Sequence, residues 1–197
     1  MGSIKPEEAR AAALSLEDLG VSYVDAPVSG GTKGAEEASL AIMAGGTVED
    51  FAYVTAALSA MGRPVHVGPV GAGQLAKLAN QAIVGITIAA VAEAMLMLHK
   101  GGADPAAVRA ALMGGFADST ILQLHGARMT TGDFTPGGLC ILQLKDLNNA
   151  VSEAESFGLS LPTLIHTRDR FQRLVTELDG AELDHSALYL ELRDQNG

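Results

Sequence analysis

The sequence predicts an α/β region followed by an all-α region that is organised around one long central helix. Strand-like runs occur only before residue 68, and they are Val21–Val28, Leu40–Met43 and Val65–Val67. From Gly71 onward we find no further strand signal. Residues 74–98 are mostly apolar, contain no Pro and a single internal Gly, and can form a helix of about 37 Å.

Local signals mark the helices on either side of these runs. In the first region, one helix is expected to start at Pro6 and end before Gly20, and another to run from a Thr47 cap to Ala60. In the second region, we expect further helices to begin at the following positions: Asp104–Pro105, Ser119, Gln143, Leu161–Pro162 and Asp184.

Composition excludes several classes of protein. A net charge of −10 without any Lys/Arg run opposes nucleic-acid binding. The single Cys140 gives no disulfide framework, so a reducing cytoplasm is the default location. Ile83–Leu98 is too short for a membrane span and carries Glu93, which favours a core helix over a membrane segment.

The five histidines lie at residues 66, 99, 125, 166 and 185 and show no spacing typical of metal ligands. We expect each of them to be a surface or capping residue, and no metal site.

Lys77 is the first candidate for chemistry. Three polar side chains near the start of the apolar helix fall on one face, namely Lys77, Asn80 and Gln81. Desolvation and the positive helix N-terminus both disfavour an ammonium there. They move the pKa of such a lysine towards the range that a general acid or base requires. The alternative is a lysine that extends to solvent from the first turn. Spacing alone leaves both readings open.

Three further segments each have a functional and an ordinary interpretation. Gly71-Ala72-Gly73 follows a strand and opens a helix, as a dinucleotide loop does, but no second strand with an acid follows, so we reject that function. Ser29-Gly30-Gly31 offers a hydroxyl and mobile amides to a carboxylate, or is a tight turn. Lys145-Asp146 is by itself typical of a solvated helical turn.

Taken together, these segments resemble the β-hydroxyacid dehydrogenase family. Asp25-Ala26-Pro27-Val28-Ser29-Gly30-Gly31 is similar to its substrate-binding motif, Gly71-x-Gly73-x-x-x-Lys77-x-x-Asn80 to its catalytic motif, and Lys145-Asp146-Leu147 to its cofactor-closing motif. Within the family the chain looks most like 2-hydroxy-3-oxopropionate (tartronate semialdehyde) reductases, with 3-hydroxyisobutyrate and threonate dehydrogenases close behind. Residues 69–197 resemble a 6-phosphogluconate dehydrogenase C-terminal-like domain.

The resemblance implies reversible hydride transfer between NAD or NADP and a small 3-hydroxy acid or its semialdehyde. It implies that Lys77 exchanges the proton, that Lys145 contacts the cofactor, and that a set of five residues binds the carboxylate substrate: Ser29, Gly30, Gly31, Asn80 and Gln81. The family usually has Gly at Ala38 and an aromatic residue at Gly138. We expect the second change to open space beside the nicotinamide and substrate.

The family's first strand, its Gly-x-Gly-x-x-Gly turn and the following helix have no counterpart in these residues. We therefore expect residues 1–68 to be the second half of a Rossmann-like domain, and 69–197 a helical substrate and dimerisation domain. On this reading the chain alone is inactive and forms a homodimer or larger homo-oligomer. The alternative is a non-catalytic dimerisation module or a truncated relic of such an enzyme.

The isolated chain is predicted to bind NADH and NADPH only weakly, because the pyrophosphate of a dinucleotide normally rests on that Gly-rich turn and helix N-terminus. Fluorescence titration with each cofactor measures this. A low-micromolar dissociation constant for either one would contradict the prediction.

Overall fold

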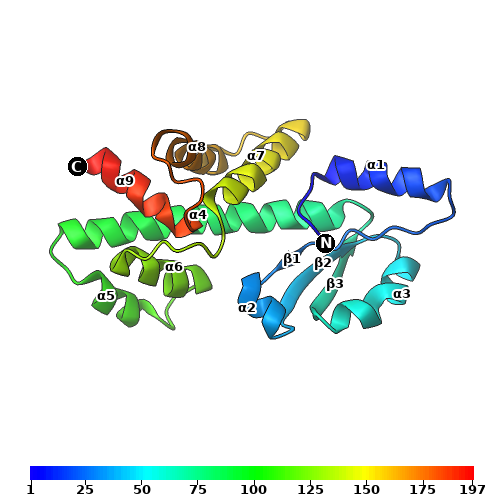
Figure 1. Cartoon of the computed structure of the whole chain (residues 1–197), viewed down its shortest axis with the longest axis horizontal. Coiled ribbons are helices and arrows are strands. Elements are labelled where there is room, and N and C mark those ends of the chain that lie inside the picture. Colours follow the sequence, from blue (N-terminus) through cyan, green and yellow to red (C-terminus); the bar gives the residue numbers. More distant parts are fainter. The chain divides into compact units, whose positions relative to one another are not determined.

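The computed structural model describes all 197 residues, which form two compact units, Met1–Asn80 and Gln81–Gly197 (Figure 1). The helix α4 (Ala72–Lys100) contributes residues to both units. The domain boundary expected from the sequence, at residues 68–69, lies just before this helix. In either division the strands precede the helical part, so the predicted order of an α/β region and then a helical region is confirmed.

The first unit contains a small mixed sheet of three strands in the order β1-β2-β3. Strand β2 (Leu40–Gly45) pairs in parallel with β3 (Gly62–Gly68) and antiparallel with β1 (Val28–Ser29). The crossover between the parallel strands is α3 (Val48–Ser59), which packs against both of them. Its N-cap is the predicted Thr47, whose side chain accepts a hydrogen bond from the Asp50 amide at 3.0 Å.

Two other helices complete the first unit, α1 (Pro6–Glu17) and α2 (Gly31–Glu36). Side chains from β2 and α3, including Ile42 and Leu58, form its buried apolar cluster. Because the strands pack against this cluster, the ends of the loops that connect them are held in place.

The predicted strand Val21–Val28 is wrong over most of its length. Only Val28 belongs to β1, and Asp25 forms an isolated antiparallel bridge with Gly45. Between these two points Pro27 has no N–H to donate, so the ladder is interrupted, although its carbonyl accepts a bond from the Met43 amide at 3.0 Å.

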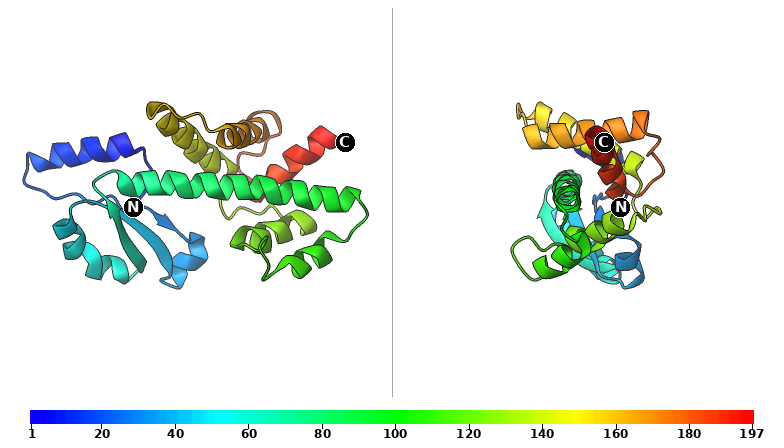
Figure 2. Two further views of the ribbon diagram at one scale, coloured as in Figure 1. Left: turned by 180° about the vertical axis from the view of Figure 1, so that it is seen from behind. Right: turned by 90° about the vertical axis from the view of Figure 1, so that its left-hand side faces the viewer.

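The second unit is all helical, and its part of α4 lies between α5–α6 on one side and α7–α9 on the other (Figures 1 and 2). The helices after α4 are α5 (Pro105–Leu112), α6 (Thr120–Thr131), α7 (Cys140–Ser156), α8 (Pro162–Glu177), the 3-10 turn η1 (His185–Ala187) and α9 (Leu188–Asn196). The predicted caps Asp104 and Ser119 accept amide hydrogen bonds of α5 and α6.

Helix α7 starts at Cys140, three residues before the predicted Gln143. The amides of Cys140 and Ile141 donate to the carbonyls of Leu183 and Ala181, at 2.9 and 3.1 Å. Carbonyl groups distant in sequence thus accept the free amides of the first turn, and no local capping residue marks this helix start in the sequence.

A buried ion-pair network joins α4, α8 and α9. The Arg170 guanidinium contacts Glu191 at 2.9 Å and Glu93 at 3.1 Å, and Arg173 reaches Glu191 at 3.1 Å. Glu191 is fully buried, and each of the two arginines that contact it offsets part of the cost of burying its charge.

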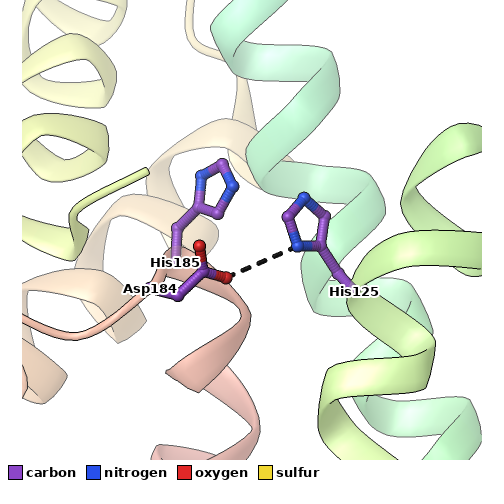
Figure 3. Close-up of side chains that lie close together, drawn as sticks. All are labelled: His125, Asp184 and His185. Carbon is purple, nitrogen blue, oxygen red and sulfur yellow. Dashed lines mark ion pairs between the residues drawn. The ribbon is translucent and has the colours of Figure 1, made fainter. Parts of the chain in front are cut away.

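Asp184, whose side chain is drawn in Figure 3, fixes the chain before α9 through hydrogen bonds of both carboxylate oxygens. Its Oδ1 accepts bonds from the Ser186 amide at 3.0 Å and the Ser186 hydroxyl at 2.5 Å, and its Oδ2 accepts the amides of Gly137 and Gly138, both at 3.1 Å. Burial by itself raises the pKa of Asp184, but the nearby His125 ring and these donors outweigh it and hold the pKa well below its usual range.

Two histidine rings lie beside this carboxylate, with centroids 4.5 Å apart in an edge-to-face arrangement. The buried Nδ1 of His125 is 3.5 Å from Asp184 Oδ1 but forms no hydrogen bond, so we treat this contact as electrostatic. Burial, together with the His125 ring, lowers the pKa of His185 to about 4. His185 is therefore neutral in the folded protein at pH 7.

We predict that the stability of the protein falls as the pH is lowered from about 6.5 to about 4. Within this window the unfolded chain takes up a proton at His185 and the folded chain does not, which can cost up to about 3 kcal/mol. Urea unfolding at several pH values measures it. His185→Phe should flatten the dependence, and the exposed control His166→Phe should not; equal slopes in all three proteins contradict the assignment.

Candidate active site

The turn after β1 is built to present backbone amides. Ser29 is the last residue of β1 and is half-buried, whereas Gly30 and Gly31 are exposed. Their φ angles are 143° and 63°, values that residues other than glycine rarely adopt. The three predicted substrate-binding residues thus form an accessible turn with one hydroxyl and two adjacent N–H groups.

Lys77 and Asn80 lie near the start of α4 and are half-buried. Their i, i+3 spacing places both on one face of the helix. Both belong to the first unit, as does the turn Ser29–Gly31, so five of the predicted site residues share one compact unit.

The start of α4 is bound to the segment that carries the turn. The Asp25 carboxylate accepts the Gly71 amide through Oδ1 and the Gln74 amide through Oδ2, both at 2.8 Å. The amides that flank the Gly-rich start of α4, those of Gly71 and Gln74, are therefore bound to a carboxylate of the protein itself. Asp25 opens the motif that contains the predicted substrate turn, four residues before Ser29, and this position is the only signal in the sequence for its structural role.

Gln81 and Lys145 belong to the second unit. Gln81 and Gln143 exchange two hydrogen bonds, one between their side chains at 3.1 Å and one from Gln143 Nε2 to the Gln81 carbonyl at 3.0 Å. Gln81 thus ties α4 to α7. The exposed Lys145 ammonium lies 3.0 Å from the buried Asp146 carboxylate on the same helix.

Gly138 is more confined than the sequence suggested. A Cβ at this position would lie 3.2 Å from Cε1 of His185. The expected space beside Gly138 is therefore partly filled by the His185 ring, which comes from a distant part of the sequence.

The cluster of His125, Asp184 and His185 is the one place where the structure groups possible metal ligands, with ligand atoms within 4.8 Å of one another (Figure 3). Sequence spacing did not indicate it. Both Asp184 oxygens already accept hydrogen bonds, and the Arg128 guanidinium lies 3.8 Å from Oδ2. We assign the cluster to support of the η1 turn.

The chain matches known proteins over both units. Residues 71–192 match the family described as NAD-binding of NADP-dependent 3-hydroxyisobutyrate dehydrogenase, and residues 1–71 match the NAD binding domain of 6-phosphogluconate dehydrogenase. The 2-hydroxy-3-oxopropionate reductase of Escherichia coli K12 is 46% identical over 189 residues, which cover 95% of this chain and 64% of the reductase. The 3-hydroxyisobutyrate dehydrogenase of Pseudomonas aeruginosa is 34% identical, with coverage of 86% and 59%.

Solved structures agree with these matches. A 3-hydroxyisobutyrate dehydrogenase from Salmonella typhimurium has a TM-score of 0.88 at 25% identity, covering 95% of this chain and 66% of its own. The Mycobacterium tuberculosis 3-hydroxyisobutyrate dehydrogenase with L-serine has a TM-score of 0.87 at 30% identity, with coverage of 97% and 68%. This chain spans less than two thirds of the two relatives compared by sequence. It belongs to the NADP-dependent 3-hydroxyisobutyrate dehydrogenase family of β-hydroxyacid dehydrogenases.

Proposed function

We propose that this protein is an NAD(P)-dependent oxidoreductase that transfers hydride reversibly between the cofactor and a small 3-hydroxy acid or its semialdehyde. One observation carries the proposal: a Gly-rich carboxylate turn and a lysine-bearing helix start share one unit of a chain 46% identical to 2-hydroxy-3-oxopropionate reductase. The reduction of 2-hydroxy-3-oxopropionate (tartronate semialdehyde) to glycerate is the preferred reaction. 3-Hydroxyisobutyrate and threonate are the rival substrates.

The substrate carboxylate is proposed to bind the Ser29 hydroxyl and the amides of Gly30 and Gly31. The positive φ angles of the two glycines allow successive N–H groups to converge on an anion. Asn80 and Gln81 are then proposed to contact the substrate, with Asn80 orienting its hydroxyl or carbonyl. In a chain of net charge −10, such local donors are needed to hold an anion.

Lys77 is proposed to exchange the proton. In reduction, its ammonium donates a proton to the substrate oxygen as hydride reaches carbon; in oxidation, the neutral amine takes that proton from the hydroxyl. The ammonium also offsets the negative charge that develops on oxygen, which is the kind of electrostatic term that usually dominates.

NAD or NADP supplies or accepts the hydride when bound. In the second unit, the exposed ammonium of Lys145 suits contact with an anionic dinucleotide. In the first, we propose that residues 1–68 are the second half of a Rossmann-like domain, supported by the match of residues 1–71 to an NAD binding domain. We place the enzyme in the cytoplasm, because its one thiol, Cys140, is buried and unpaired.

Lys77→Ala is predicted to lower kcat at least ~100-fold in a form of the protein with a complete NAD(P)-binding domain, since general acid catalysis is lost. Cofactor affinity should change little. Lys77→Arg should not restore activity, because guanidinium keeps its proton. Steady-state reduction of tartronate semialdehyde measures both. Lys100→Ala, at the far end of the same helix, is the control; near-normal turnover of Lys77→Ala ends the assignment.

The apolar surface of α4 supports a homodimer. By length and mean hydropathy (1.9) α4 could cross a membrane, and 39% of its 18-residue apolar window is buried inside the protein, which leaves the rest of its apolar surface uncovered. Ile83 and Met97 are 67% and 69% exposed and lie on one face with the exposed Ala90 between them, at the seven-residue spacing of helix–helix contacts. We propose that a second copy covers this stripe.

Sedimentation at micromolar concentration is predicted to show a dimer or larger homo-oligomer. Met97→Glu should shift the protein towards monomer, because a charge in an apolar contact is costly. Tyr53→Glu, at a 91% exposed position on α3, should not. A wild-type monomer contradicts the proposed dimer.

A further inference from the structure

Asp25 is the buried ionisable residue that joins the two parts of the proposed site in the first unit. It is 2% exposed, and each carboxylate oxygen accepts an amide of the α4 start, from Gly71 and Gln74, at 2.8 Å. Its own backbone amide donates to the Gly45 carbonyl at 3.0 Å, and its carbonyl accepts the Gly45 amide at 2.8 Å. Backbone and side chain of one residue therefore connect β2 to the first turn of α4.

The position of Asp25 along the chain makes this connection relevant to the site. Ser29 follows Asp25 by four residues, and Pro27 between them has a ring that fixes its backbone φ angle. Lys77 lies three residues after Gln74, whose amide binds Asp25, and is therefore on the same face of α4, one turn further along the helix. The two hydrogen bonds of Asp25, to the Gly71 and Gln74 amides, thus connect the chain segment of the carboxylate-binding turn with the helix that carries the lysine.

The surrounding glycines leave the Asp25 carboxylate no freedom. A Cβ at Gly45 would lie 2.5 Å from Oδ1, and a Cβ at Gly73 would lie 2.8 Å from Oδ2 and 2.5 Å from the Met43 carbonyl. A carboxylate held this closely by backbone cannot be replaced by water or by a longer acid. It also places negative charge at the positive end of a helix, where it is favourable.

We propose that Asp25 is a positioning residue for the reaction, which fixes the distance between Lys77 and the Ser29–Gly31 turn. It touches neither substrate nor cofactor and acts through Lys77, so the inference rests on the proposed function. Asp25→Asn is the sharpest change: it is isosteric, but its NH₂ must face the N–H of either Gly71 or Gln74, and one hydrogen bond becomes a repulsion.

The kinetic test is a double-mutant cycle in the form with a complete NAD(P)-binding domain. Asp25→Asn should lower kcat for tartronate semialdehyde about 10- to 100-fold, the scale of a small misplacement of reacting groups, with the KM for NADPH nearly unchanged. In the Lys77→Ala background it should lower kcat less than twofold further, because the group it positions is gone. The same loss in both backgrounds shows a merely structural role and overturns the proposal.

A control and a direct probe complete the experiment. Asp104→Asn alters another helix-capping aspartate, which binds the Ala106 amide of α5 at 2.9 Å, and should leave kcat unchanged. Hydrogen exchange on the wild-type 197-residue chain should show the Gly71 and Gln74 amides as protected as the middle of α4. Rapid exchange at both overturns the proposal without any variant.

Two further outcomes separate this inference from the function beneath it. If Lys77→Ala is inactive but Asp25→Asn has wild-type kcat, Asp25 has no positioning role and the proposed function stands. If Lys77→Ala is fully active, both are wrong. Asp25→Ser keeps one acceptor and is smaller, and it takes the place of the Asn variant should that protein fail to fold.

Discussion

The carboxylate of Asp25 and the two amides it binds set the geometry of the first unit. This contact holds the irregular segment before β1 to the first turn of a 29-residue helix and excludes side chains from Gly45 and Gly73. The first amides of a helix have no partner within the helix, and here the Asp25 carboxylate accepts two of them. A charged acceptor makes a stronger hydrogen bond than a neutral one. The groups proposed to bind the carboxylate and to exchange the proton extend from it on either side.

The second unit is held by polar contacts that replace short-range sequence signals. Arg170 and Glu191 connect α8 with α9 in the interior, and Asp184 gathers the amides of the loop before α7 and of η1. The Arg170–Glu191 pair and the bonds from Asp184 to Gly137 and Gly138 join segments distant in the sequence, whereas the bonds from Asp184 to Ser186 are a local cap of η1. The His185 ring beside Asp184 stays neutral because burial lowers its pKa to about 4.

Sequence reasoning succeeded where the determining interaction is local. Thr47, Asp104 and Ser119 cap their helices within three residues, so pattern and capping chemistry sufficed. It failed where a partner comes from elsewhere, as in the early start of α7 and the strand shortened at Pro27. The residues named for the site came from a motif resemblance, and five fall in one unit. The grouping of two histidines around Asp184 had no signal, because tertiary contact alone creates it.

The proposed reaction depends on Lys77 delivering a proton to a substrate held by the Ser29–Gly31 turn. A crystal structure of the protein with a complete NAD(P)-binding domain, bound to NADPH and a non-reacting small hydroxy carboxylate, tests this most directly. We expect Lys77 Nζ to lie about 2.6–3.2 Å from the substrate oxygen, the distance over which a proton is transferred. We also expect the carboxylate on the Ser29 hydroxyl and the Gly30 and Gly31 amides. A carboxylate bound elsewhere, with Lys77 directed to solvent, would contradict it.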